Sequence, residues 1–174
     1  MRTSLLRCLA LTLALPLAAL AQDRASDLQV KAAFLYKFGD FVQWPPPAFP
    51  AAETPFAIGV LGADDLAAAL ESLVVNRTVQ GRPIVVRRVR RGDALTGLHV
   101  LFIGQAVPET LSAARGHPLL TVTDSEGAIA QGAMINFVAD AERVRFDVAL
   151  PSAERGQLRI SARLLAVARR VITS

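Results

Sequence analysis

The segment from Leu98 to Ile103 restricts the possible fold more than any other part of the chain. Its residues are almost all apolar, and it is followed by Gly104. A run of this length without polar alternation is typical of a β-strand that is covered on both faces. Phe56 to Leu61, followed by Gly62, repeats the pattern. We therefore expect a sheet that has helices on both of its faces.

Helical and extended segments alternate along most of the chain. The predicted helices are 26–44, 64–73, 108–115 and 160–171, and the predicted strands are 56–61, 83–89, 98–103, 119–123, 133–138 and 144–150. Ser26 is the expected N-cap of the first helix after a frayed terminus, and Val30, Phe34 and Phe38 recur at helical spacing toward the core. The expected fold is α/β, a single compact domain with a mixed sheet of about six strands flanked by helices on both faces.

Residues 1–21 have the composition of a cleavable secretory signal peptide. Two arginines precede the apolar run Cys8 to Leu20, which ends in the small-residue pattern Ala19-Leu20-Ala21. The run is too short for a membrane-spanning helix, which needs roughly 20 apolar residues. We expect removal of residues 1–21 and a single domain over residues 22–174, located in the periplasm.

The composition of the remaining chain offers no enzyme chemistry. Cys8 is the only cysteine, so the exported domain would lack thiol catalysis and cysteine zinc sites. His99 and His117 lack the spacing with carboxylates of a zinc site. No serine lies in a Gly-x-Ser-x-Gly motif, and no glycine-rich phosphate-binding motif occurs. We expect no catalytic residue, no metal and no cofactor.

Three segments are candidates for partner binding. The first is the basic run 87–91, in which Arg90 and Arg91 would contact an acidic partner or protect a sheet edge from unwanted pairing. It has no interleaved aromatic residues, so nucleic acid is not expected. The second is Trp44, before three prolines, which either caps the core or forms an exposed aromatic anchor. The third is the polar loop 124–129, where Glu126 is a candidate contact and Ile129 either tucks inward or meets a partner.

Several stretches, in this order, resemble one family. They are Val30 to Phe38, Phe41 to Pro45, Ile58 to Gly62, Val79 to Ile84, His99 to Gly104, Leu120 to Asp124, Gly132 to Phe137, Val144 to Val148 and Leu158 to Leu165. The chain resembles the YfiR family of exported bacterial proteins over almost all of the region after the signal peptide.

The resemblance implies a regulatory function. The characterised type of this family is a periplasmic repressor that binds the periplasmic sensor domain of an inner-membrane diguanylate cyclase and holds cyclic-di-GMP production down. An outer-membrane lipoprotein can sequester the repressor, which promotes biofilm formation, and dimers are usual, so a homodimer is expected. Characterised relatives carry cysteines that link oxidation to repression, and the exported domain here would have none.

A periplasmic small-molecule binding or sensing protein is the alternative function. Open α/β sheets often bind ligands beyond the carboxyl ends of their strands. Gly62 and Gly104 follow two such ends in this sequence.

Overall fold

The computed structural model describes residues 15–104, 108–140 and 143–174 of the chain. Its strands are β1 (Val42–Gln43), β2 (Phe56–Leu61), β3 (Thr78–Val79), β4 (Arg82–Val89), β5 (Val100–Ile103), β6 (Leu120–Thr123), β7 (Ile135–Asp140), β8 (Arg143–Ala149), β9 (Arg159–Ile160) and β10 (Arg170–Ile172). Its helices are α1 (Leu15–Phe41), the 3-10 helix η1 (Pro46–Ala48), α2 (Asp64–Leu73), α3 (Pro108–Ala114), α4 (Leu150–Arg155) and α5 (Ala162–Leu165).

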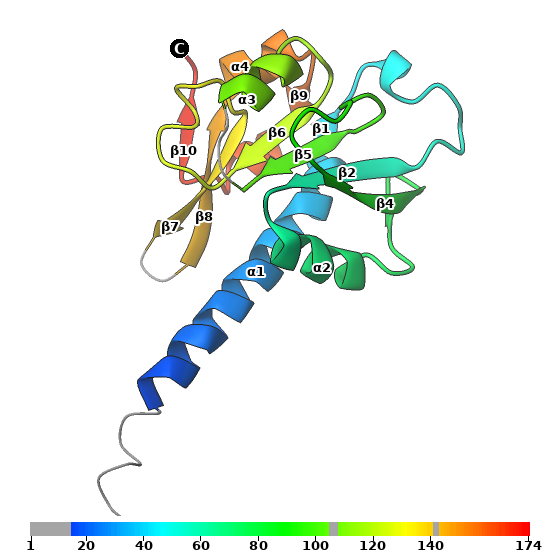
Figure 1. The fold of residues 1–174 in the computed structure, drawn as a ribbon. Helices are drawn as coiled ribbons and strands as arrows, with labels where there is room; N and C mark the ends of the chain where they lie inside the picture. The colour runs from blue at the N-terminus through cyan, green and yellow to red at the C-terminus, as the bar shows by residue number, and fades with distance from the viewer. Residues whose placement is uncertain (1–14, 105–107, 141–142) are drawn as a thin grey trace, which may run out of the picture.

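One mixed sheet of eight strands organises the molecule. Its order is β10-β8-β7-β6-β5-β2-β4-β3, and β1 pairs separately with β9 (Figure 1). Strands β4, β2, β5, β6 and β7 are parallel, whereas β8 is antiparallel to β7 and parallel to β10. The α/β class is confirmed, with two strands more in the main sheet than the sequence predicted.

The adjacent interior strands β2 and β5 are buried along their whole length, as predicted. Every residue of β2 and β5 is buried. One face of the sheet packs against α1 and α2, where Phe38, Phe137 and Phe146 form a cluster of aromatic rings. The other face packs against α3, where Leu111 contacts a smaller apolar cluster that includes Ile103. The sheet is therefore covered on both faces.

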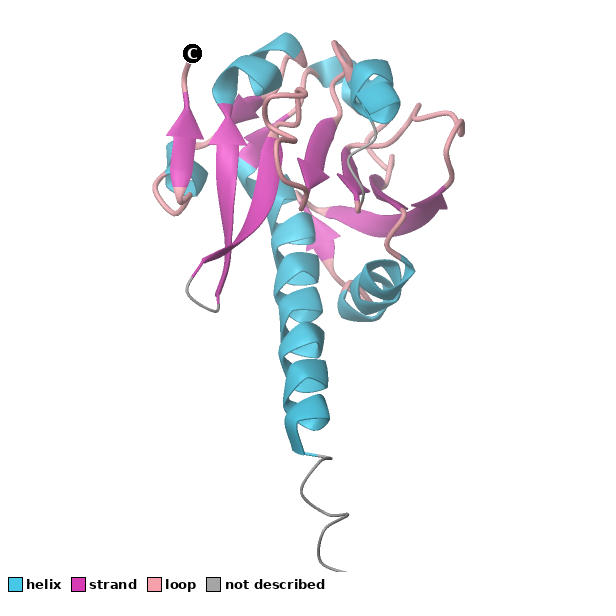
Figure 2. Cartoon of the chain, turned by 60° about the vertical axis from the view of Figure 1, so that its left-hand side comes forward, coloured by secondary structure: helices cyan, strands magenta, loops and turns pink. Residues whose placement is uncertain are grey.

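The first helix begins earlier than predicted. Helix α1 starts at Leu15, so residues 22–26 are helical and Ser26 is an exposed residue inside the helix, not its N-cap. Apolar residues before position 22 continue the helix without interruption. The C-terminal half of α1 packs on the sheet and the N-terminal half projects beyond it (Figure 2). Val30 lies in the packed half but is 37% exposed and does not join the core, whereas Leu28 packs against it.

The predicted signal peptide falls mostly outside the described residues. Residues 1–14 are not described, and residues 15–21 belong to α1. No helix in the described ranges is long and apolar enough to cross a membrane.

The predicted C-terminal helix over residues 160–171 is wrong. Only α5 is helical, with the Ser161 hydroxyl accepting a hydrogen bond from the Arg163 amide at its start. The chain then pairs with the sheet, where the Arg169 amide donates to the Phe146 carbonyl at 2.8 Å and β10 runs parallel to β8. Pairing with the exposed edge of β8 outweighs the helical periodicity of the local sequence, and this pairing places two arginines against the sheet.

Two substitutions on α1 test this packing. Phe38→Ala should lower the free energy of unfolding by about 3–5 kcal/mol, because Phe38 is fully buried among other aromatic rings. Val30→Ala on the same helix should change it by less than about 0.5 kcal/mol. Urea unfolding of both variants measures the difference, and equal losses would contradict the arrangement of α1.

Candidate functional site

A row of polar side chains crosses one end of the sheet. The strand register places Thr123, Asn136, Asp147 and Arg170 next to one another on four adjacent strands. Directly paired residues project from the same face of a sheet. The same row continues toward the opposite edge with apolar residues that pack against α3, namely Ile103, Leu61 and Val89. The polar part of the row thus lies beside the apolar cluster under α3.

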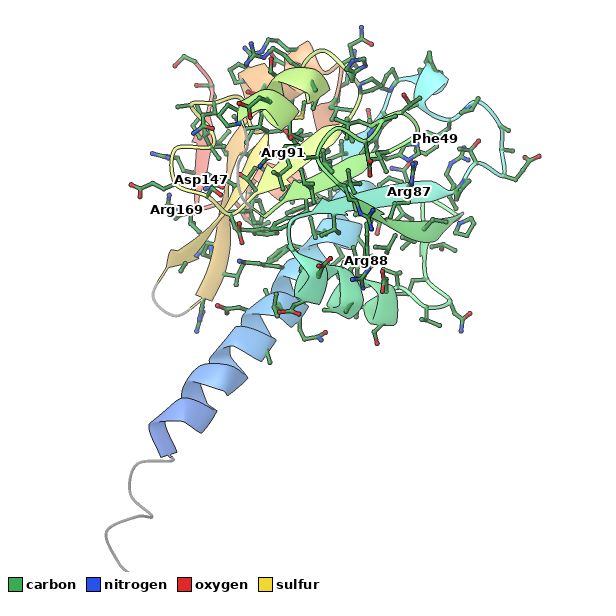
Figure 3. All side chains as sticks on the ribbon, viewed as in Figure 1. Phe49, Arg87, Arg88, Arg91, Asp147 and Arg169 are labelled. Atoms are coloured by element: carbon green, nitrogen blue, oxygen red, sulfur yellow. The ribbon has the colours of Figure 1, made fainter. Side chains whose placement is uncertain are left out.

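Asp147 is the central charged group of this row. Its side chain is only 2% exposed, and its two oxygens accept hydrogen bonds from Arg169 Nε at 2.8 Å and Arg169 Nη2 at 2.7 Å. Arg170 Nη2 donates to the same carboxylate at 2.9 Å. These hydrogen bonds, first of all those from Arg169, hold the pKa of the Asp147 carboxyl below its usual range. Figure 3 shows Asp147 and Arg169 side by side at this end of the sheet.

The two arginines keep contact with solvent while they bind the buried carboxylate. Arg169 is 38% and Arg170 62% exposed. One buried negative charge therefore holds two positive groups, and the cluster carries a net positive charge at the surface.

The loop between β6 and β7 is fixed next to this cluster by side-chain hydrogen bonds. Asn136 Oδ1 accepts from the Thr123 hydroxyl at 2.6 Å and from the Ser125 amide at 3.1 Å. Lys31 on α1 forms an ion pair with Asp124 at 2.8 Å. Ala128 is fully buried in the apolar cluster under α3. The loop is therefore held at its start by polar contacts and in its middle by apolar packing.

A surface hollow of about 510 Å³ lies between this loop and the arginines. It is lined by Glu126 and Ile129 from the loop, and by Asn136, Asp147 and Arg170 from the sheet. Glu126 is exposed and Ile129 is half-buried, because Ala128 takes the inward position. The structure thus brings together two of the five predicted binding residues in one site, which we call the Asp147 hollow. It combines acidic, apolar and basic groups, a set that suits a protein surface of mixed character.

The sequence predicted Glu126 as a binding residue but not three other charged groups of the hollow, Asp147, Arg169 and Arg170. The sequence predicts Arg169 and Arg170 near the end of the helix 160–171, and only the pairing of β10 with β8 brings them to Asp147. One signal was present in the sequence: Asp147 is a single acid between Phe146 and Val148 in a strand that is otherwise buried there.

Trp44 lies in a different place, against the core. Its ring contacts Phe49, Phe56 and His99 edge-on, and its Nε1 donates to the His99 carbonyl at 3.2 Å. Trp44 is half-buried and also lines a separate hollow of about 500 Å³ with Arg159. Trp44 therefore caps the core, and its role in partner binding stays a prediction.

His99 holds the loop after Trp44 onto the sheet. It is buried, its Nδ1 accepts from the Ala57 amide at 3.0 Å, and its Nε2 lies 2.9 Å from the Ala48 carbonyl. The proton therefore resides on Nε2 and the ring is neutral, since Nδ1 must accept. Burial, together with the charge of Arg82, lowers the pKa of His99 despite these hydrogen bonds. His99 is therefore a core histidine whose two ring nitrogens both have partners.

The remaining two predicted residues lie at the end of β4. Arg90 and Arg91 are exposed and line a third hollow, of about 300 Å³, together with Asp93 and Glu109. On its outer side β4 pairs only with β3, through Arg82 and Pro83, so the basic run lies at the end of a strand whose outer edge is largely open. Whether these charges protect the edge or contact an acidic partner stays a prediction. In the described parts of the chain, no three His, Cys, Asp or Glu side chains lie close enough to share a metal ion.

Comparison with known proteins places the chain in a family. A family model described as YfiR/HmsC-like matches residues 28–169. The chain belongs to the YfiR/HmsC-like family. This family is regulatory and periplasmic and is not a known family of enzymes. Among curated proteins no match was found.

The YfiR/HmsC-like match includes most of the residues discussed above. Trp44, Arg90, Glu126, Ile129 and Asp147 all lie inside it, and it ends at the first of the two arginines that bind Asp147. The Asp147 hollow is therefore built almost entirely from the part of the chain that defines the family.

The contribution of Asp147 to stability can be measured. Asp147→Asn should lower the free energy of unfolding by about 2 kcal/mol at pH 7, because it removes the counter-charge of two arginines; their partial exposure limits the loss. Since the native pKa of Asp147 is lowered, its contribution is present above about pH 4 and is lost as the pH falls through the native value. Glu126→Gln in the same hollow is the control and should leave stability unchanged. Equal unfolding curves for wild type and Asp147→Asn would contradict this account.

His99 predicts a second pH effect. Its native pKa lies below that of the unfolded chain, so the unfolded chain binds the proton more readily and stability falls as the pH drops below about 6.5. His99→Phe should lower the free energy of unfolding by about 1–3 kcal/mol at pH 7, because the Ala57 amide loses its hydrogen-bond partner. It should also lose part of the pH dependence between pH 7 and 5. Thermal unfolding at several pH values between 7 and 5 measures this dependence. The control variant His117→Gln, at an exposed position, should show the same change of stability with pH as the wild type.

Proposed function

We propose that this protein is a periplasmic regulator that binds the periplasmic sensor domain of an inner-membrane diguanylate cyclase and represses it. The match of residues 28–169 to the YfiR/HmsC-like family carries this proposal. The composition of residues 1–21 supports export to the periplasm. Repression would lower cyclic-di-GMP and restrain biofilm formation, and the protein would act without catalysis or a cofactor.

The Asp147 hollow is the surface that we assign to the sensor domain. Ile129 offers apolar contact at the rim, and Glu126 and Arg170 offer charges of opposite sign. Such a pattern favours one orientation of a partner, because a shifted complex would bring like charges together. Binding can transmit a signal only if the protein has different affinities for the active and inactive sensor conformations.

Other contacts of the regulator remain part of the same proposal. A homodimer and an outer-membrane lipoprotein that sequesters the protein both follow from the family resemblance. Trp44 and the pair Arg90 and Arg91 lie on surfaces separate from the Asp147 hollow. They provide places for such additional partners.

A small-molecule sensor is the second candidate function, and the Asp147 hollow is the observation that favours it. The floor of the hollow contains buried Asn136 and Asp147, which are polar groups that could orient a ligand. Near Gly62 and Gly104 the backbones of the two strand ends lie close together, since the Gly104 amide donates to the Leu61 carbonyl at 2.8 Å. A Cβ atom at Gly104 would lie 2.6 Å from the Gly62 carbonyl oxygen. A solute that raises the melting temperature by several degrees, and no longer does so in Asp147→Asn, would favour this alternative.

Cyclic-di-GMP in cells tests the leading proposal. Deleting the gene should raise cyclic-di-GMP several-fold, and the wild-type protein should restore the low level. A double variant, Glu126→Arg with Ile129→Asp, should fail to restore it because both rim contacts of the hollow change. Glu53→Arg, on an exposed loop elsewhere, is the matched control and should restore it fully.

One control and two possible outcomes decide the result of that experiment. Urea unfolding must show that the double variant is folded at the growth temperature. Unchanged cyclic-di-GMP on deletion would contradict repression of a cyclase. Full complementation by the folded double variant would contradict the assignment of the Asp147 hollow to the sensor domain.

A further inference from the structure

The outer edge of β4 is largely unpaired. On one side, residues 84–89 pair with residues 56–61 of β2. On the other side, β3 pairs only with Arg82 and Pro83, and no other strand in the described ranges reaches β4. Alternate residues of such an edge direct their N–H and C=O groups away from the sheet. The segment 84–89 is therefore a template on which one more strand can pair.

The two faces of this edge differ in charge. On the face toward α2, Arg88 is neutralised by Glu71, with Nε and Nη2 each 3.0 Å from a carboxylate oxygen, and Asp64 lies 3.4 Å from its Nη1. On the other face, Val85 is 42% exposed and the charged group is Arg87. Arg87 donates to the Thr96 carbonyl at 3.4 Å and has no acidic partner among the described residues. Figure 3 shows Arg88 near α2.

Two further arginines extend this positive charge beyond the end of the strand. Arg90 and Arg91 are exposed, and neither forms an ion pair with a residue in the described part of the chain. Asp93 accepts a hydrogen bond from the backbone amide of Arg90, at 2.8 Å, and does not pair with its guanidinium. Residues 87–91 therefore hold three arginines that have no acidic partner among the described residues, one on the open edge and two just beyond its end.

The charge selects the kind of strand that can add here. A second copy that paired β4 with β4 would bring two basic runs together, which like-charge repulsion opposes. A segment with carboxylates on alternate residues would instead gain both backbone hydrogen bonds and ion pairs. We propose that an extended, acidic segment of a partner protein adds as a strand to the outer edge of β4, with its carboxylates against Arg87, Arg90 and Arg91. This surface is distinct from the Asp147 hollow, and the proposal does not require the partner to be a cyclase.

Synthetic peptides test the proposal on the whole protein. The probe is an eight-residue peptide of alternating glutamate and valine, and its control has lysine in place of glutamate. Fluorescence anisotropy should show binding of the acidic peptide and none of the basic one. The triple variant Arg87→Glu, Arg90→Glu and Arg91→Glu should bind the acidic peptide at least about tenfold more weakly. The control variant Arg143→Glu, Arg145→Glu and Arg163→Glu changes the net charge equally at exposed positions elsewhere and should bind as the wild type does.

Backbone methylation of the peptide separates strand addition from simple charge attraction. One peptide carries N-methyl groups on its glutamates and a second carries them on its valines. A strand pairs with an edge through alternate residues, so one of these peptides should lose binding and the other should retain it. Hydrogen exchange should also slow in residues 84–89 when the unmethylated peptide binds.

Several results would overturn the proposal. They are absence of binding by the acidic peptide, equal binding of the lysine peptide, and equal binding of both methylated peptides. A dimer in which residues 84–89 are protected from exchange would assign the edge to a second copy and would overturn it as well. None of these results would affect the cyclase proposal, which rests on cyclic-di-GMP levels and on variants of Glu126 and Ile129.

Discussion

The ion pair of Asp147 with Arg169 and Arg170 is the interaction on which the C-terminal part of the fold depends. Asp147 is almost fully buried on β8, and such a carboxylate is stable only if positive or hydrogen-bonding groups surround it. Both of those groups come from the last six residues of the chain. The buried charge therefore acts together with the backbone pairing to β8 in holding β10, and Arg170 of β10 lines the hollow that Glu126 and Ile129 border.

The same row of residues has a structural part and a part that is open to a partner. On β4, β2 and β5 the row consists of the apolar side chains of Val89, Leu61 and Ile103. They pack beneath α3, which gives the sheet a stable second face. On the next four strands, from Thr123 on β6 to Arg170 on β10, the side chains of the row are polar. The hydrogen bonds of Asn136 in this part fix the loop that carries Glu126. A rigid sheet thus positions a loop whose exposed side chains are free to be recognised.

The sequence predicted the parts of the fold that depend on local pattern. The buried strands β2 and β5, helix α2 and the hairpin of β7 and β8 follow from runs of apolar residues and from loop length. The helix predicted for the C-terminal segment was wrong because helical spacing of apolar residues is a local signal. The pairing of Arg170 with Asp147 instead joins two strands that are separated in the sequence. For the same reason the sequence indicated Glu126 and Ile129 as candidates but gave no sign that Arg169 and Arg170 lie beside them.

Photo-crosslinking in living cells tests most directly whether the Asp147 hollow is the regulatory surface. A photoreactive phenylalanine derivative in place of Glu126 would report the protein that lies against the hollow, and the same group in place of Glu53 would serve as the control. We predict a crosslink from position 126, and none from position 53, to a membrane protein that carries a diguanylate cyclase domain. Crosslinks from position 53 alone, or none from position 126 in cells where the protein represses the cyclase, would contradict the account.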